Sequence, residues 1–333
     1  MKQFIVQQNE AGQRLDKLLA KILNKAPKSF LYKMLRKKNI TLNGKKADGA
    51  EKLNMDDLIT LFLSDDTIAE FSEQFKTVSI DTTSVASNIH VIYEDEHVLF
   101  VNKPLGVLSQ KAEKNDISMV EYIIAYLLSA KQITVENLKS FKPAICNRLD
   151  RNTSGILIAG KSLIGLQEMA KLLKDRTLDK YYLCIVKGKV ETKQRIEGYL
   201  TKDEMKNQVK IHQKQMEDTE YICTEYEPIS FSKKPSIDPE DYTLLQVKLI
   251  TGRSHQIRAH LASIGHPILG DFKYGDKKTN QLFKNKYGLT HQLLHSYRMK
   301  LPKLEGELSY LSNKEFQAEL PEIFSRIKKD LMN

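Results

Sequence analysis

One polar segment divides this chain of 333 residues into two parts of different character. Residues 64–88 contain five acidic residues, one lysine and nine serines or threonines. This composition is typical of a linker, and a short helix is predicted within it around Ala69–Phe75. We therefore predict a small domain at residues 12–63, a linker at 64–88 and a larger domain at 89–325. The chain length agrees with this division, since one domain takes roughly 150 residues.

The overall composition is that of a globular protein. Hydrophobic residues make up 41% of the chain and charged residues 28%, which excludes a disordered or collagen-like chain. No apolar run approaches the roughly 18 residues that a membrane-spanning helix needs. The first eight residues are too polar for a secretory signal. We therefore expect a cytoplasmic protein without membrane segments.

The small domain has a clear pattern of helices and strands. Apolar residues from Leu15 to Leu23 recur at helical spacing, and Pro27 ends this helix. A second short helix follows, with its apolar side between Phe30 and Leu35. A hairpin with an Asn-Gly turn is predicted over residues 40–46, and the returning strand over residues 58–62.

Positive charge is concentrated in this small domain. The chain has 52 lysines and arginines against 42 aspartates and glutamates, a net charge of +10. Residues 12–62 alone hold twelve basic and five acidic residues, a net charge of +7. A solvated charged face is one explanation, but clustering along one helix and one hairpin favours a surface that follows nucleic-acid phosphates. The residues predicted to bind there are Arg36, Lys37, Lys38, Lys45 and Lys46.

Strands and helices are mixed in the larger domain without regular βαβ alternation, which predicts an α+β fold. Helices are expected at residues 117–129, 163–175 and 255–264. Strands are expected at residues 89–93, 98–102, 155–160, 181–187, 208–213, 220–228 and 243–250.

Two segments of the larger domain carry candidate chemistry. In the first, Asp150 lies between Arg148 and Arg151 in a polar loop before an apolar strand, and the two guanidiniums favour an ionised carboxylate. A structural salt bridge is the alternative explanation. In the second, residues 251–261 form a strand end, a glycine turn and a helix start, from which Arg258 could reach a buried acid.

No metal site is predicted from the cysteines and histidines. The three cysteines, at 146, 184 and 223, form no C-x-x-C pair, so reduced and mostly buried thiols are expected. The three histidines at 255, 260 and 266 lack the spacing of a zinc-binding helix and have no acidic ligand nearby in the sequence.

Together these segments resemble the RluA-type pseudouridine synthases. That family carries a His-Arg-Leu-Asp-x-x-Thr-Ser-Gly loop, which matches residues 147–155 with Asn147 in place of the histidine. Its Thr-Gly-Arg-Thr-His-Gln-Ile-Arg segment matches residues 251–258. Lys180-Tyr181-Tyr182 and Asn102-Lys103-Pro104 match further family motifs, so the resemblance covers about residues 89–300. The small domain resembles the αL RNA-binding domain of the ribosomal-protein-S-four type.

The resemblance implies a pseudouridine synthase fold, with a mixed, mostly antiparallel sheet and flanking helices. It also implies a catalytic role for Asp150, which either attacks the anomeric carbon of the sugar or helps remove the neighbouring sugar proton. Arg258 would pair with this aspartate, and Tyr182 would stack on the target base. Ile257 would line the pocket, and Arg148 would fill the space that the flipped base leaves. For Tyr182 and Ile257, ordinary core packing is the alternative.

The predicted activity is isomerisation of uridine to pseudouridine in RNA, without a cofactor or a metal. Large-subunit ribosomal RNA is the expected substrate, and a monomer the expected state. Two alternatives stay open: the same chemistry on transfer RNA, and a non-catalytic RNA-binding or ribosome-assembly protein.

Overall fold

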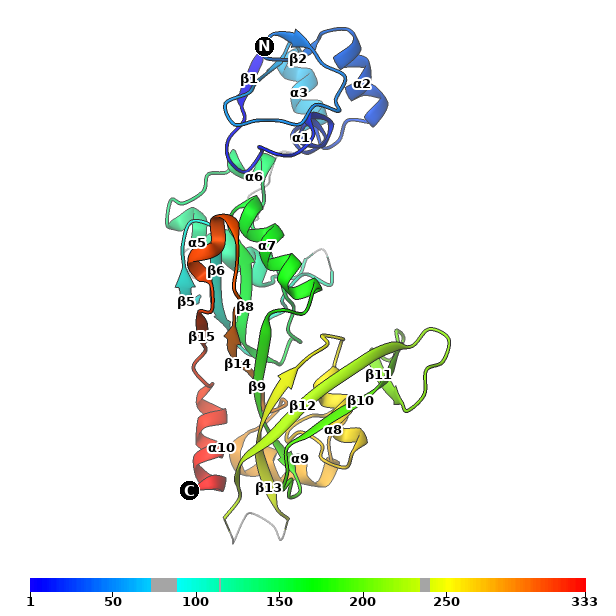
Figure 1. Ribbon diagram of the computed structural model, residues 1–333, viewed down its shortest axis with the longest axis vertical. Helices are drawn as coiled ribbons and strands as arrows, with labels where there is room; N and C mark the ends of the chain where they lie inside the picture. Colours follow the sequence, from blue (N-terminus) through cyan, green and yellow to red (C-terminus); the bar gives the residue numbers. More distant parts are fainter. Residues whose placement is uncertain (73–88, 114, 234–239) are drawn as a thin grey trace.

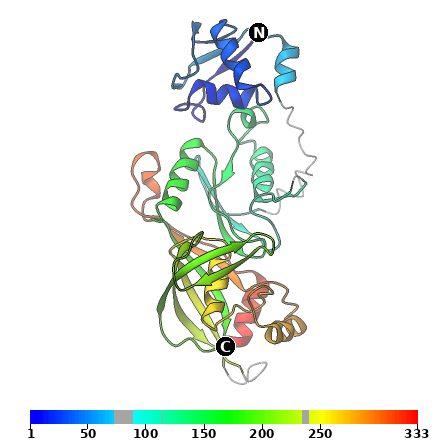
Figure 2. The ribbon, with the colours of Figure 1, turned by 90° about the vertical axis from the view of Figure 1, so that its right-hand side faces the viewer.

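The computed structural model describes residues 1–72, 89–113, 115–233 and 240–333. Its longest axis runs from a small N-terminal unit at one end to the C-terminal helix near the other, as two perpendicular views show (Figures 1 and 2). Between them lies one large sheet that extends through most of the chain.

The N-terminal unit packs three helices on a small sheet. The strands have the order β1-β4-β2-β3. At the tip of the predicted hairpin, Asn43 and Gly44 have φ angles of 50° and 71°, as a type I′ turn requires. The elements are β1 (Lys2–Ile5), α1 (Leu15–Ile22), α2 (Lys28–Arg36), β2 (Ile40–Leu42), β3 (Lys45–Lys46), β4 (Leu58–Leu61) and α3 (Asp65–Phe71).

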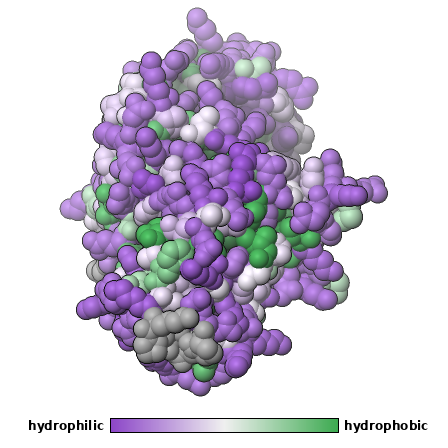
Figure 3. Space-filling model, turned by 60° about the horizontal axis from the view of Figure 1, so that its bottom comes forward, coloured by the Kyte–Doolittle hydropathy of each residue, from purple (hydrophilic) through white to green (hydrophobic). Residues whose placement is uncertain are grey.

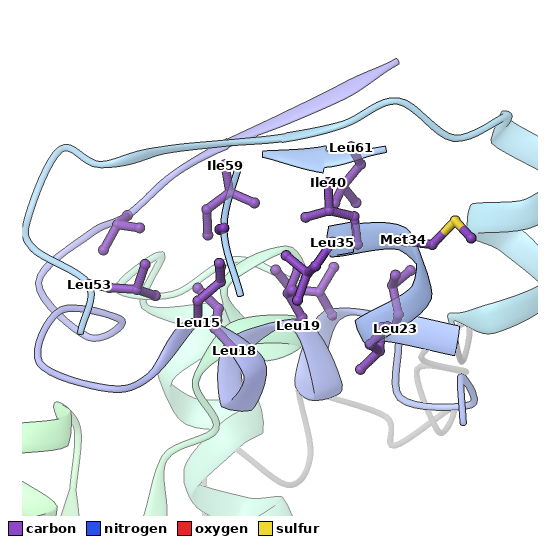
Figure 4. Packing of buried hydrophobic residues seen from close by; sticks show 14 of the residues in the cluster. Leu15, Leu18, Leu19, Leu23, Met34, Leu35, Ile40, Leu53, Ile59 and Leu61 are labelled. Carbon is purple, nitrogen blue, oxygen red and sulfur yellow. The ribbon is translucent and has the colours of Figure 1, made fainter. Parts of the chain in front are cut away.

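A single apolar core holds this unit together. Leu15 and Leu19 on α1 point towards Ile40 and Ile59 on the strands, and all four side chains are fully buried (Figure 4). Burying one such side chain contributes about 1.5–3 kcal/mol. The predicted helical spacing from Leu15 to Leu23 is therefore confirmed as the buried face of α1.

The unit extends past both predicted domain boundaries. Strand β1 begins at Lys2, before residue 12, and pairs with β4 along its whole length. Helix α3 lies inside the predicted linker and ends at Phe71. The ring centre of Phe71 lies 4.4 Å from that of Phe30. Ser64 caps α3 by accepting a hydrogen bond from the amide of Thr67. The composition of residues 64–88 as a whole is polar and so did not reveal the short apolar face of α3. The rest of the predicted linker, residues 73–88, lies outside the described part of the chain.

The larger domain is built on an eleven-stranded sheet with mostly antiparallel neighbours, so the predicted α+β class is confirmed. Its order is β11-β10-β12-β13-β9-β14-β8-β6-β5, with β15 beside β14 and β7 beside β8. The parallel pair is β14 with β8. The strands are β5 (His90–Glu94), β6 (Val98–Lys103), β7 (Ala144–Ile145), β8 (Ser154–Gly160), β9 (Asp179–Lys187), β10 (Gln194–Asp203), β11 (Gln208–His212), β12 (Glu220–Phe231), β13 (Tyr242–Leu249), β14 (Leu294–Lys300) and β15 (Glu315–Gln317).

Helices flank this sheet. The three predicted ones are present as α5, α7 and α8. The 3-10 turn Gly306–Leu311 packs beside α7. The helices are α5 (Met119–Ser129), α6 (Asn137–Ser140), α7 (Leu163–Lys174), α8 (Gln256–Ser263), α9 (Lys277–Tyr287) and α10 (Glu322–Met332).

Several elements of the larger domain were not predicted from the sequence. Strand β10 is mostly polar and half exposed, and α9 buries only part of a Lys- and Asn-rich sequence. Helix α10 runs past the predicted domain end at residue 325, and Ile327 and Leu331 are buried in the same cluster as Phe283. The larger domain therefore includes the C-terminal helix.

The two units touch at defined polar contacts. The hydroxyl of Ser140, at the end of α6, donates to the Glu10 carboxylate at 2.6 Å. The amide of Leu163, at the start of α7, donates to the Asn9 side chain at 3.1 Å. The loop after β1 is thus attached to two helices of the larger domain.

The face of the molecule around α10 is mostly hydrophilic (Figure 3). Viewed from the end that carries α10, polar groups cover most of the face, and apolar groups gather near its centre (Figure 3). In the described ranges, no helix has the length and apolarity to span a bilayer. Cys184 and Cys223 are buried free thiols, and Cys146 is a partly buried one.

Candidate active site

The loop that carries Asp150 is held by its backbone. It precedes β8, whose residues are all buried. Ser109 bridges Leu149, donating to its carbonyl at 2.8 Å and accepting from its amide at 2.9 Å. The amide of Thr153 donates to the carbonyl of Asp150 at 3.0 Å and closes the turn. A side chain at Asp150 is therefore presented on a fixed backbone.

Asn147, which replaces the histidine of the family motif, anchors the start of this loop. Its amide group donates to the carbonyl of Ile156 at 3.2 Å, and its carbonyl oxygen accepts from the amide of Ile158 at 2.8 Å. Both partners belong to β8. The substitution thus leaves the loop tied to the strand that it enters.

The glycine of the loop motif is required by close strand packing. Gly155 has a φ of 111°, and a Cβ atom there would lie 2.1 Å from the carbonyl oxygen of Ser296 on β14. A larger residue would separate β8 from β14.

Arg258 joins two carboxylates. Its Nη1 donates to Asp150 Oδ2 at 2.8 Å, while Nε and Nη2 donate to the two oxygens of Asp271 at 2.7 and 2.8 Å. The exposed fractions of the side chains are 7% for Arg258, 1% for Asp271 and 27% for Asp150. Burial opposes the charge, but the hydrogen bonds and charges of the two aspartates raise the pKa of Arg258 above its usual range. The guanidinium is therefore a permanently charged and rigid partner of Asp150.

Asp271 is the site residue that sequence reasoning missed. Burial alone would raise its pKa, but the hydrogen bonds and charge of Arg258 outweigh burial and lower it. Its Oδ1 also accepts from the amides of Lys273 and Tyr274, at 2.9 and 3.1 Å. The sequence predicted Asp150 as the partner of Arg258 and did not identify this second acid. The Gly-Asp pair at residues 270–271, within the resemblance, was the available signal.

The predicted partners of Asp150 need one correction. The sequence placed Arg148 and Arg151 on either side of the carboxylate. Among the described residues, however, its ion pair is with Arg258 at 2.8 Å, and the His255 ring nitrogen Nε2 lies 4.0 Å away. Adjacent residues in an irregular loop point in different directions, so sequence neighbours need not share a contact.

The start of α8 is bound to the sheet by Gln256. Its amide nitrogen donates to the carbonyl of Cys223 and to Thr224 Oγ1, both at 3.0 Å. The preceding His255 takes a φ of 51°, which lets the chain turn sharply from the strand into the helix. Its Nδ1 lies 2.9 Å from the hydroxyl of Tyr274, and burial lowers its pKa.

All five predicted site residues of this domain surround one small cavity of about 80 Å³, namely Arg148, Asp150, Tyr182, Ile257 and Arg258. It adjoins an open cleft of about 840 Å³ that shares Arg148, Asp150 and Arg258. Six basic side chains and a single acidic one, Asp150, line this cleft. The arrangement suits an anionic polymer that inserts one group towards a carboxylate.

Strand β9 separates the two adjacent tyrosines. Tyr182 is 5% exposed and packs with Leu149 and Ile257 beside the cavity. Tyr181 lies on the opposite face, where the Arg298 guanidinium is 4.1 Å from its ring centre. Burial raises the pKa of Tyr182 to about 12, so its phenol is neutral near pH 7.

Lys103, from the Asn-Lys-Pro motif, lies beneath the Asp150 loop. It is fully buried, and its ammonium donates to the carbonyls of Pro104, Val107 and Arg151 at 2.7 to 3.0 Å. Burial lowers its pKa to about 7. Lys103 therefore links the segment after β6 to the loop that presents Asp150.

The predicted RNA-binding residues lie far from this cavity in the chain and in space. Arg36, Lys37 and Lys38 are exposed at the end of α2, and Lys45 and Lys46 are exposed on β3. Both elements belong to the N-terminal unit at the end of the molecule (Figure 1). In the described ranges, no three His, Cys, Asp or Glu side chains gather as a metal site would require.

Comparison with known proteins identifies the family. The model of the RNA pseudouridylate synthase family matches residues 97–263. An uncharacterized RNA pseudouridine synthase of Mycoplasma genitalium is 30% identical over 305 residues, which cover 91% of this chain and 90% of the relative. The chain belongs to the RNA pseudouridylate synthase family. The activity predicted from its motifs, isomerisation of uridine in RNA, is thereby confirmed.

Further members of this synthase family resemble the chain over most of its length. The ribosomal large subunit pseudouridine synthase C of Escherichia coli is 28% identical over 294 residues, covering 88% of this chain and 86% of the relative. The protein of the same name from Vibrio parahaemolyticus is 27% identical, covering 98% and 97%. Among solved structures, human RNA pseudouridylate synthase domain containing 4 matches with a TM-score of 0.59 and 19% identity, covering 75% of this chain and 96% of that one. This last likeness shows the shared fold.

Proposed function

We propose that this synthase acts on uridines of large-subunit ribosomal RNA and that Asp150 is its catalytic residue. The observation that carries the proposal is the cavity in which Asp150, held by Arg258, faces Tyr182 and Ile257. The relatives from Escherichia coli and Vibrio parahaemolyticus are named for the large ribosomal subunit. The enzyme is expected to act as a monomer in the cytoplasm.

The reaction breaks the bond between uracil nitrogen and ribose, turns the base and rejoins it through carbon. Asp150 serves either as the nucleophile at the anomeric carbon or as the base for the neighbouring sugar proton. Both routes need a carboxylate with a fixed direction, which the Arg258 hydrogen bond supplies.

The walls of the cavity accept the base. Tyr182 offers its ring for stacking, and Ile257 offers an apolar side that excludes water. Unstacking a nucleotide from RNA costs a few kcal/mol. Arg148, at the boundary of cavity and cleft, offsets part of that cost by stacking where the base has left.

The N-terminal unit binds a part of the folded RNA that lies at a distance from the target uridine. At least two of the five residues Arg36, Lys37, Lys38, Lys45 and Lys46 contact phosphates, which position the RNA without reading its sequence. Base recognition then rests on the larger domain.

The test is a map of pseudouridines in total RNA. Cells that lack the gene are compared with cells that carry the natural enzyme or the Asp150→Asn variant. We expect one or more pseudouridines in large-subunit ribosomal RNA that require the natural enzyme, and their complete loss with Asp150→Asn. The variant should retain RNA affinity, because Asn keeps the shape of the side chain.

Three results would contradict the proposal in different ways. Loss of pseudouridines from transfer RNA would show that the substrate is transfer RNA and not large-subunit ribosomal RNA. Sites still modified by Asp150→Asn would overturn the catalytic role. An unchanged map would favour a binding protein without activity.

A further inference from the structure

One large apolar side chain stands exposed in the cleft. Phe272 is 59% exposed and lines the same cleft as Asp150 and Arg148. Among the described residues that line this cleft, it is the only Phe, Tyr or Trp. Single exposed apolar side chains are common on protein surfaces, so what singles out Phe272 is its position beside a candidate active site and not its exposure alone.

The backbone of Phe272 is fixed although its side chain is free to face the cleft. The preceding Asp271 is held by Arg258, and its carbonyl accepts from the Asn280 side chain at 2.8 Å. The amide of Lys273 donates back to Asp271 at 2.9 Å. Phe272 thus directly follows Asp271, the residue that orients Arg258. Through Arg258, Asp271 also orients Asp150.

The surroundings of the ring are cationic. The Lys273 ammonium donates to the carbonyl of Asn207 at 2.7 Å, which ties this loop to the turn between β10 and β11. Lys202, Arg253 and Arg151 line the same cleft. An exposed phenyl ring among cations is the combination that binds single-stranded nucleic acid, with the ring stacking on a base and the cations beside its phosphates.

We propose that Phe272 stacks on an unpaired base next to the target uridine and so holds the RNA strand in register with Asp150. The inference rests on the proposed function and deepens it, because it names a residue that selects unpaired RNA. Since Phe272 does not line the small cavity that holds Asp150, Tyr182 and Ile257, its contribution is to binding and not to the chemical step.

The test uses fluorescence of 2-aminopurine, which stacking quenches. The probes are nine-nucleotide single-stranded RNAs with a central uridine and 2-aminopurine beside it or four positions away. The full-length chain carries Asp150→Asn, so that no turnover takes place. We expect quenching beside the uridine, its loss with Phe272→Ala and its retention with Phe272→Tyr. Affinity should fall about tenfold with Phe272→Ala, within the range of one base–aromatic stack.

Phe231→Ala is the matched control. Phe231 is 40% exposed on β12 and is not among the cleft residues. Its removal should leave both quenching and affinity unchanged. Equal quenching by Phe272→Ala and the parent chain, or equal losses with Phe231→Ala, would overturn the inference.

Turnover is measured separately with Asp150 intact. Phe272→Ala should raise KM about tenfold and leave kcat within about twofold, since binding alone is weakened. A fall in kcat at unchanged KM would overturn the register role. Absence of any turnover in the natural enzyme would overturn the proposed function, while the fluorescence result on Phe272 would still stand.

Discussion

The two units of this protein differ in where their charged side chains lie. In the N-terminal unit, the basic side chains on α2 and β3 are exposed, while the buried core is mostly apolar. In the larger domain, the charged groups Lys103, Arg258 and Asp271 lie inside, each hydrogen-bonded to named partners. Exposed charges are nearly interchangeable, because water and salt screen them. Buried charges are specific, because each depends on one geometry.

This contrast separates binding from chemistry. A lysine can neutralise a phosphate from several side-chain conformations, so the basic residues of the N-terminal unit need no exact relative positions. A reacting carboxylate must keep its direction within a fraction of an ångström, so the larger domain gives it a buried arginine held by a second acid. Changes in the larger domain should therefore have the larger effects.

The largest effect is expected from Arg258→Met. It leaves the buried Asp271 unpaired and Asp150 undirected, which should cost about 3–5 kcal/mol of unfolding free energy. Activity should fall by about a thousandfold or more, because the aspartate loses its orientation. Chemical denaturation and turnover on a pseudouridine-forming substrate measure the two effects. Arg253→Met is the matched control for stability, since its ion pair with Glu220 is at the surface and contributes about 1 kcal/mol or less.

A double variant sharpens this result. Arg258→Met combined with Asp271→Leu removes the buried acid as well, so part of the lost stability should return without activity. If activity returned together with stability, Arg258 would serve only the fold.

A smaller effect is expected from acid, through the buried His295. Its side chain lies 2.8 Å from Ser154 at the start of β8, and burial lowers its pKa from 6.5 to about 4. Between these values only the unfolded chain binds the proton, so the free energy of unfolding falls as the pH drops from about 6.5 to about 4. The loss reaches about 3 kcal/mol.

Urea denaturation at several pH values measures this loss. His295→Asn should be less stable at pH 7 but lose less stability on acidification than the natural chain. The exposed His90→Gln serves as the control and should keep the natural pH dependence. Equal acid losses in all three chains would rule out His295 as the source.

The smallest effect is expected when exposed charge is removed from the N-terminal unit. Five substitutions to glutamine, at Arg36, Lys37, Lys38, Lys45 and Lys46, should leave stability unchanged. If two of these residues contact phosphates, the slope of log affinity against log salt should fall by about 2, and affinity at 0.15 M salt by roughly thirtyfold. Binding titrations over a range of salt measure both values, and an unchanged slope would mean a solvated face. Substitution is a cleaner test than deleting residues 1–64, since deletion would uncover Ile68 on α3.

Much of the fold followed from local patterns. The buried face of α1, the Asn-Gly hairpin and the strand after the Asp150 loop were predicted, because apolar spacing and turn chemistry act over a few residues. Among the elements that were missed, β10 and α9 are mostly polar in sequence and leave a weak pattern, whereas α10 has a regular apolar face that was overlooked.

The sequence by itself determined which residue types meet at the site, including Asp150 and an arginine facing a buried acid. The resemblance already named Tyr182 and the pairing of Arg258 with Asp150. Only the tertiary structure decided that Asp271 is a second acid on Arg258 and that Lys103 supports the loop from below. Spacing along one element sets which face a side chain occupies. It does not set what lies opposite that face, because distant segments are brought there by packing of the whole domain.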